Sequence, residues 1–187
     1  VMVKIFLLSF LFFVGNAWAE SIDELKVRAA EGNSVAQYAL GNSYYYGEGF
    51  KQDYKEAAKW YRLAAKQGDA SARDRLGYIH YNGHGVDQDY KEAVKWWQLA
   101  AEQGNAGAQY NLGVVNSNGE GLIQNYKEAI RLYIKVSDAG NNYYASFAEL
   151  NLSALYLEGK VVPQDYKKAF EWARKAGENH PAYNTDS

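Results

Sequence analysis

The sequence predicts an all-α fold, an α/α solenoid of antiparallel helix pairs with about four repeats behind one N-terminal capping helix. The first reason is a repeated pattern, Leu-Gly-x5-Gly-x-Gly, which begins at Leu40, at Leu76 and at Leu112, so that both steps are 36 residues long. The second reason is that apolar residues inside each repeat recur at the helical spacing of three and four. A fixed period of this size is typical of units that bury their apolar faces only by stacking on their neighbours.

The repeats account for most of the chain. A weaker fourth copy begins at Leu152, 40 residues after the third, which places about four inserted residues within Asn141 to Ser146. Ser21 and Glu24 form the start signal of another helix before the first repeat. We therefore predict a signal peptide at 1–19, a capping helix at 20–32, repeats at 33–68, 69–104, 105–140 and 141–180, and a flexible tail at 181–187.

The first helix of a repeat is predicted at about Val35 to Tyr46. Ala36, Leu40 and Tyr44 follow one another at a spacing of four and therefore share one face of this helix. Gly41 stands beside this face, where the absence of a side chain permits another helix to cross closely. The Gly-x-Gly that follows ends the helix, because glycine adopts positive φ angles without steric cost.

The second helix is predicted to open at Asp53. The Asp53 carboxylate can accept from free amides of the first turn, and Glu56 three residues later can reach back to the Asp53 amide in a capping box. Lys168 replaces the glutamate in the last copy, which predicts a weaker cap there. The same pair recurs at Asp89 with Glu92 and at Asn125 with Glu128.

Large and small apolar residues alternate along the second helix. They are Ala57, Trp60, Tyr61, Ala64 and Ala65, and their equivalents include Trp96, Trp97, Leu132, Tyr133 and Trp172. An aromatic stripe at this spacing is more often packed core than a ligand cage, so we interpret it as core. Because no partner helix is predicted after the last copy, the face with Phe170 and Trp172 is expected to be partly bare.

The N-terminal segment has the three-part layout of a secretory signal peptide. Lys4 lies in a short basic head, Ile5 to Val14 is almost wholly apolar, and Ala17 to Ala19 is a small-x-small cleavage pattern. The alternative is an uncleaved anchor, but the apolar run is short for a membrane span. We expect cleavage after Ala19, a periplasmic or secreted product, and no stable membrane insertion after cleavage.

Composition excludes several classes of function. The formal net charge is −2 and no basic run is present, so the chain has no electrostatic basis for binding nucleic acid or anionic lipid. The chain has no cysteine, which excludes a thiol nucleophile and leaves packing alone to hold an exported fold. We expect a monomer.

No pattern of residues predicts an enzyme, a cofactor or a metal site. His80 and His84 are four residues apart, but Gly83 lies between them and one of the two falls in the Gly-x-Gly loop, which argues against a shared metal ion. His180 precedes a proline in the predicted tail. The Gly-x-Gly loops follow helices, whereas phosphate-binding loops follow strands. We therefore predict a protein without catalytic residues.

The first helices also carry positions that differ between repeats. These positions form a stripe beside the packed face, and their amide, tyrosine and arginine side chains suit recognition of a protein loop or extended peptide. A merely solvated helix face is the alternative for any single residue. The predicted partner-binding residues are Asn42, Tyr46, Arg75, Tyr78, Asn82, Asn111, Asn118, Asn151 and Glu158, with Ala39, Val114 and Ala154 on the same stripe.

The repeat resembles a known family. The stretches Ala36 to Gly41 and Ala64 to Gly68 are similar to the Sel-1-like repeat, a relative of the tetratricopeptide repeat, and the resemblance covers nearly all of Ser21 to Gly177. Departures fall mainly in the third and fourth copies, as at Asn116 and Ser153. The resemblance implies a right-handed superhelix whose first helices line a concave face.

The resemblance also implies a function. Such proteins generally act as adaptors or inhibitors that bind other proteins, and bacterial members are often exported. We expect an exported, non-enzymatic protein that binds another protein of unknown identity through its concave face. Two narrower alternatives remain open: a periplasmic immunity protein that neutralises a secreted toxic effector enzyme such as a type VI secretion lipase, and an envelope assembly or signalling adaptor.

Overall fold

A computed structural model describes residues 21–140, 143–159 and 163–179. The predicted signal peptide, its cleavage site and the predicted tail lie outside the described residues. The described part contains helices and no strand. The helices are α2 (Ile22–Ala30), α3 (Ser34–Tyr46), α4 (Tyr54–Lys66), α5 (Ala70–Asn82), α6 (Tyr90–Glu102), α7 (Ala106–Asn118), α8 (Tyr126–Asp138), α9 (Ala145–Glu158) and α10 (Tyr166–Glu178).

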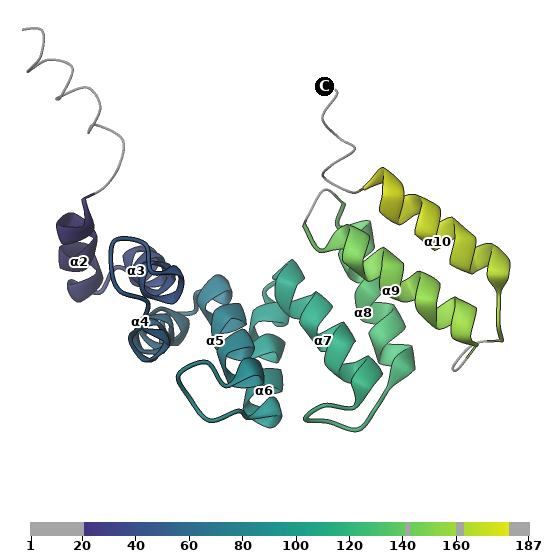
Figure 1. The fold of residues 1–187 in the computed structure, drawn as a ribbon, viewed down its shortest axis with the longest axis horizontal. Helices are drawn as coiled ribbons and strands as arrows, with labels where there is room; N and C mark the ends of the chain where they lie inside the picture. Colours follow the sequence, from purple (N-terminus) through teal and green to yellow (C-terminus); the bar gives the residue numbers. More distant parts are fainter. Residues whose placement is uncertain (1–20, 141–142, 160–162, 180–187) are drawn as a thin grey trace, which may run out of the picture.

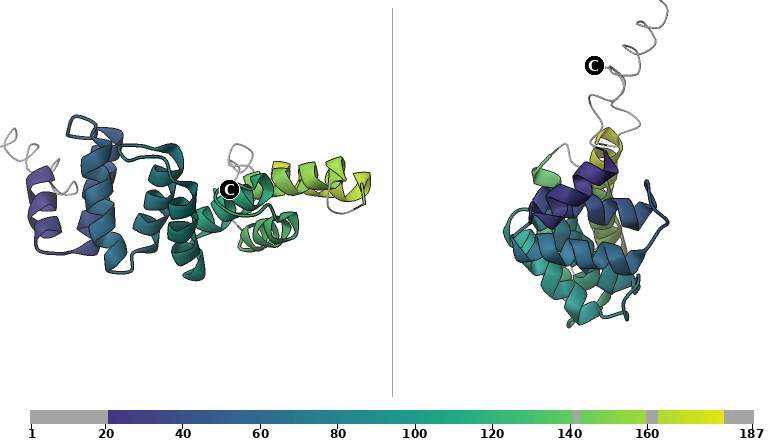
Figure 2. Two further views of the ribbon diagram at one scale, coloured as in Figure 1. Left: turned by 90° about the horizontal axis from the view of Figure 1, so that it is seen from below. Right: turned by 90° about the vertical axis from the view of Figure 1, so that its left-hand side faces the viewer.

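The helices form the predicted α/α solenoid. They pair as α3 with α4, α5 with α6, α7 with α8 and α9 with α10, and each pair packs against the next, while α2 packs on α3. The pairs follow an open arc from α2 to α10, and α3 and α5 lie nearer the inside of this arc than α4 and α6 (Figure 1). The view along the stack from the N-terminal end shows the pairs one behind another (Figure 2). The first helices α5 and α7 also contact each other directly.

Glycine and an acidic cap set the turn between the two helices of a repeat. The first helix ends at Gly47, whose φ of 77° lies in the left-handed region that favours glycine. The next helix begins after Asp53, whose carboxylate accepts from the amides of Lys55 and Glu56 at 2.9 and 3.0 Å. Both features were predicted from the sequence and are confirmed.

The second half of the predicted capping box is wrong. The Asp53 amide donates to the carbonyl of Tyr44 at 2.9 Å, so it does not need the Glu56 carboxylate, which pairs with Lys59 instead. In the last copy the capping bond itself is kept, since Asp165 accepts from the Lys168 amide at 2.9 Å; a weaker cap there stays a prediction. The equivalent loop bonds are those of Asp89 to His80 at 2.9 Å, Asn125 to Asn116 at 2.8 Å and Asp165 to Tyr156 at 3.0 Å.

The two helices of a repeat cross at the predicted glycine. A Cβ atom added to Gly41 would lie 2.6 Å from the Tyr61 ring, and one added to Gly77 would lie 2.5 Å from the indole of Trp97. These distances are far shorter than ordinary van der Waals contact, so only glycine fits. Ser153 occupies the position in the last copy, and its hydroxyl donates to the Ala169 carbonyl at 2.8 Å.

The aromatic stripe of the second helices is core, as predicted, but its members are buried to different degrees. Tyr61 and Trp97 are fully buried, whereas Trp60 and Trp96, one residue earlier in each repeat, are half-buried. At the last repeat Phe170 is 69% exposed, although Ala58 at the equivalent position of α4 is buried. The C-terminal face of α10 is therefore bare, as expected, while Trp172 remains half-buried.

One position on each first helix links it to the preceding repeat. Gln37 donates to the carbonyl of Ala29 at 3.0 Å, and Gln109 donates to that of Ala101 at 3.1 Å. Glu149 holds this position in the last repeat, where it is fully buried. Its carboxylate accepts from the Ser137 hydroxyl at 2.6 Å and from the Asn179 amide at 2.8 Å, and lies 3.5 Å from the Lys175 ammonium.

Candidate functional site

The first helices α3, α5, α7 and α9 form a continuous surface, which we call the inner face. Helices α3 and α7 contain no Asp, Glu, Lys or Arg, and their exposed polar groups are hydroxyls and amides. Tyrosine and asparagine recur on this surface, as at Tyr46 on α3, Tyr78 on α5, Asn118 on α7 and Asn151 on α9. Such a composition favours contacts by aromatic packing and hydrogen bonds over contacts by charge.

Tyr46, Arg75 and Tyr78 come together at the N-terminal part of the inner face. The guanidinium carbon of Arg75 lies 5.9 Å from the centre of the Tyr46 ring, at cation–π distance. The Tyr78 ring meets those of Tyr45 and His84 edge-on, at 6.4 and 5.9 Å. Tyr46 and Tyr78 are 50% and 40% exposed, so both rings remain available to a partner.

All five of the predicted asparagines already form hydrogen bonds inside the protein, and Asn111 bonds to Asp74. Asn42 accepts from the Tyr61 hydroxyl at 2.8 Å, and the amide of Asn82 donates to the Tyr78 carbonyl at 2.9 Å. The Asn118 amide donates to Glu120 at 3.2 Å, and that of Asn151 to the Tyr110 hydroxyl at 3.4 Å. These bonds fix the orientation of the side chains, and each amide keeps further capacity for a partner.

A hollow of about 370 Å³ opens between α7, α8 and α9. It brings together five residues of the predicted stripe from two repeats. Tyrosine rings from α7 and α8 form part of its wall, which makes it a place where an apolar side chain of a partner could be held. The predicted residues that line it are Val114, Asn118, Asn151, Ala154 and Glu158.

A second hollow of about 300 Å³ lies between α3, α5 and α7. Arg75 lines it, and the amide of Asn111 bonds to Asp74 on its wall at 3.2 Å. Tyr143 and Tyr144, from the segment just before α9, complete the lining. The hollow therefore draws residues from all four repeats.

Gly107 makes room for this second hollow. A Cβ atom there would lie 2.9 Å from the Tyr144 ring and 3.0 Å from an Asp74 carboxylate oxygen. Burial raises the pKa of Asp74 above its ordinary value, and Arg75 acts in the opposite direction. The Nε atom of Arg75 is buried without a hydrogen-bond partner among the described residues.

Comparison with protein families identifies the architecture. The Sel1 repeat pattern matches residues 34–69, 70–105, 106–141 and 146–180. The chain belongs to the Sel1 repeat family. Proteins built from Sel1 repeats generally mediate protein–protein interaction.

Solved structures of Sel1 repeat proteins are similar to this chain. A protective antigen with this fold from uropathogenic Escherichia coli strains is 33% identical over 90% of the chain, with a TM-score of 0.80. A Sel1 repeat protein from Oxalobacter formigenes is 34% identical over 84% of it, with a TM-score of 0.74. The chain spans 36% of the first protein and 62% of the second. A search of curated proteins found no significant match.

Two of the three histidines, His80 and His84, lie in the described residues, whereas His180 lies outside them. The Nδ1 atom of His84 lies 3.0 Å from the Tyr45 hydroxyl, and its ring stacks on Tyr54 at 4.7 Å, so it links the first two repeats. His80 is half-buried on α5. Within the described ranges no cluster of three or more potential metal ligands occurs, and none of the helices there is long and apolar enough to cross a membrane.

Sequence reasoning missed part of the inner face. Tyr38, Asp74 and Tyr110 lie one residue before the predicted stripe in their repeats, and they line the two hollows. A wider stripe would have included them, since neighbouring residues at helical spacing share a surface. Tyr143 and Tyr144 fall in the predicted insertion. The sequence indicated where the insertion lies, but its contacts with distant repeats depend on the curvature of the stack.

Proposed function

We propose that this Sel1 repeat protein is an exported, non-enzymatic protein that binds another protein through its inner face. The observation that supports this most directly is the continuity of that face. Two hollows on this face are together lined by residues of all four repeats, and two of its helices, α3 and α7, carry no charged side chain. A flexible or extended segment of a partner could contact both at once.

The inner face offers two kinds of contact to a protein segment. Exposed rings such as Tyr46 and Tyr78 supply apolar area at low cost in side-chain entropy. Asparagine amides between them can bond to the backbone of the partner, whatever its sequence. Arg75 adds a cation that forms no ion pair among the described residues, and it would select for an acidic group nearby.

The export part of the proposal rests on the sequence of residues 1–19. Its test is expression of the full chain with a C-terminal tag, followed by separation of periplasm, membrane and cytoplasm. We expect a shortened product beginning at Glu20 in the periplasm or medium. A full-length product confined to the cytoplasm or membrane would disprove cleavage after Ala19.

The binding part is tested by capture of partners from the periplasmic fraction with the tagged protein. The double variant Arg75→Ala/Tyr78→Ala is expected to melt as the wild type does and to lose most of the captured partner. Lys95→Ala on the outward side of α6 serves as a matched control that should retain it. Capture of a secreted enzyme would support the immunity role, and capture of a membrane complex would support the adaptor role. Equal capture by the double variant would disprove binding at the inner face.

A further inference from the structure

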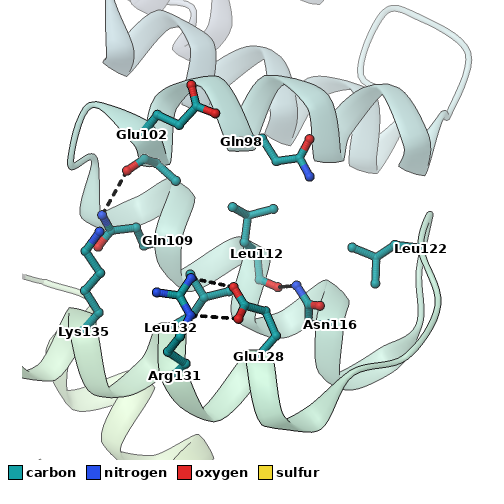
Figure 3. Close-up of a pocket in the computed structure, with 11 residues that line it drawn as sticks. Gln98, Glu102, Gln109, Leu112, Asn116, Leu122, Glu128, Arg131, Leu132 and Lys135 are labelled. Atoms are coloured by element: carbon teal, nitrogen blue, oxygen red, sulfur yellow. Dashed lines mark hydrogen bonds and ion pairs between the residues drawn. The ribbon is translucent and has the colours of Figure 1, made fainter.

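A third hollow lies on the opposite, outward side of the stack. It measures about 390 Å³ and opens between α6 and α8, with α7 as its floor (Figure 3). Leu112 on α7 and Leu132 on α8 supply its apolar surface. In Figure 3, Gln98 and Glu102 project from α6 at one edge, and Glu128 and Arg131 lie on α8 at the other.

This hollow exists because one residue differs between repeats. Leu132 stands 36 residues after Trp96 and 72 residues after Trp60, at the position that Trp172 holds in the last repeat. The other three repeats thus have tryptophan where the third has leucine. Tyr133, the next residue, keeps its large ring and its burial, so the change is confined to the outward position.

The other repeats show where the missing indole would lie. Trp60 packs against Leu25 and Ala29 of the preceding helix α2, together with Leu40 of its own first helix. Trp96 packs in the same way on the core that contains Ala65 and Leu76. In each case the indole fills the groove between its own first helix and the preceding second helix.

Burial of the surrounding residues shows that the groove at Leu132 is incompletely filled. Ala29 and Ala65, which lie beneath Trp60 and Trp96, are 1% and 2% exposed, whereas the equivalent Ala101 is only half-buried. The exposed fraction of Leu112 is 7%, whereas Leu40 and Leu76 are fully covered. An apolar surface that is covered in the neighbouring repeats is therefore open to solvent here.

We propose that this hollow is a second protein-binding site and that it receives an aromatic side chain of a partner protein, tryptophan above all. The partner would supply the indole that the third repeat lacks. The groove suits an indole in shape, because the same groove accepts tryptophan in the first and second repeats. The site lies on the opposite side from the inner face, so the proposal holds whether or not the inner face binds a protein.

The charges at the edge suit such a guest. Glu128 and Arg131 neutralise each other in a two-bonded ion pair, with distances of 2.8 and 2.6 Å. Glu102 on α6 and Lys135 on α8 also line the hollow, and neither forms an ion pair among the described residues. Glu102 can accept from an indole N–H, and Lys135 can donate to a backbone carbonyl next to the inserted ring.

A partner of different sequence explains the site better than a second copy of the chain. The tryptophans on α4, α6 and α10 are buried or half-buried in their own repeats, so the described part of a second copy offers no free indole. The exposed aromatic residues of α10 are Tyr166 and Phe170. Self-association through these residues is therefore the competing possibility, and it makes a separate, measurable prediction.

Indole itself is the probe for the hollow. Titration of the full chain with indole, followed by NMR of the Ala101, Leu112 and Leu132 methyl groups, is expected to show saturable shifts confined to these residues. Leu132→Trp fills the hollow with the residue of the other repeats, so it should fold, melt at a higher temperature and bind indole about tenfold more weakly or not at all. Leu132→Phe, a smaller change, should have an intermediate effect, and the control Lys59→Ala on the exposed side of α4 should bind as the wild type does.

A peptide pair tests the chemistry of the guest. Acetylated Gly-Trp-Gly amide is expected to compete with indole, and the matched Gly-Leu-Gly peptide to compete much less. Absence of localised shifts with indole, or equal binding by wild type and Leu132→Trp, would overturn the proposal. Sedimentation supplies the remaining test: if the wild type self-associates and Leu132→Trp does not, the occupant is a second copy and the proposal of a foreign partner is wrong.

Discussion

The first and second helices of this Sel1 repeat protein have similar lengths but differ in the charges and the buried residues that they carry. The second helices carry regular outward ion pairs, Glu56 with Lys59, Glu92 with Lys95 and Glu128 with Arg131, and a repeated row of buried rings and alanines. Three of the four first helices carry glycine at the crossing, and α3 and α7 carry no charged residue. Their surface residues change from repeat to repeat.

This difference separates the scaffold from the recognition surface. Residues that recur in most repeats lie at caps, turns and helix crossings, although Ser153 replaces the crossing glycine in the last repeat. The residues that differ between repeats are gathered on the inner face, and also at Leu132 in the outward groove. The comparison predicts that substitutions at crossings and junctions cost the most stability and that substitutions in the outward ion pairs cost the least.

The largest effect is expected at the crossing of α5 and α6. Gly77→Leu would force a side chain against the buried indole of Trp97 and should lower the free energy of unfolding by about 3 kcal/mol. Chemical denaturation measures this. The control is Gly177→Ala in α10, where a Cβ meets no other atom; it should raise the free energy of unfolding slightly through helix propensity. Equal stability of Gly77→Leu and wild type would refute the close crossing.

The buried junction before the last repeat comes second. Glu149→Ala would leave Ser137, Lys175 and Asn179 without their shared acceptor, and we expect a loss of about 2 kcal/mol. Glu149→Gln keeps the shape and one acceptor, so it should cost less. A loss as large in Glu149→Gln as in Glu149→Ala would mean that charge, and not hydrogen bonding, holds the junction.

A smaller, pH-dependent effect is expected at His80. Burial lowers the pKa of His80 below its ordinary value, and nearby Arg62 acts in the same direction, against the carboxylates of Glu92 and Asp89. As the pH falls through about 6.5, the unfolded chain takes up the proton first, so the folded state loses stability until the pH passes below the folded-state pKa.

His80→Tyr tests this effect, since Tyr44 and Tyr156 occupy the equivalent positions. The measurement is the free energy of unfolding of both proteins at pH 8 and pH 5.5. The wild type should lose more stability between these values than the variant does. Identical losses would show that His80 titrates alike in the folded and unfolded chains.

The smallest effect is expected in the outward pairs. The pair of Arg131 with Glu128 has good geometry, but both side chains are substantially exposed. Arg131→Ala should therefore cost about 0.5 kcal/mol at low salt and less as the ionic strength rises. Thermal melts at two salt concentrations measure this. A loss comparable to that of Glu149→Ala would contradict the division between scaffold and surface.

The fold could be predicted from the sequence because the same local signals occur in several successive repeats. The predicted first helix from Val35 to Tyr46 differs from α3 by one residue, and the glycine crossing was found from a single pattern. One half of the predicted capping box was wrong because the Asp53 amide donates to the Tyr44 carbonyl of the preceding helix. The local sequence does not reveal that the turn places this carbonyl next to the Asp53 amide.

The candidate site was predicted less completely than the fold. Val114, Asn118, Asn151, Ala154 and Glu158 were chosen by spacing and line one hollow together. The contacts of Tyr144 with Gly107, and the opening beside Leu132, depend on how strongly the stack curves and on how well each junction is filled. These are properties of several repeats at once, and the pattern of one repeat does not encode them. Binding by the predicted residues stays a prediction.

The amide of each residue that caps a second helix donates to a carbonyl of the first helix of its repeat. The side chains of these capping residues lie at the surface. Their backbone N–H groups, however, form the equivalent hydrogen bond in all four repeats. Exchange of these hydrogens with heavy water therefore requires the two helices of a repeat to separate. The exchange rate of one loop amide in each repeat thus measures how firmly the two helices of that repeat are held together.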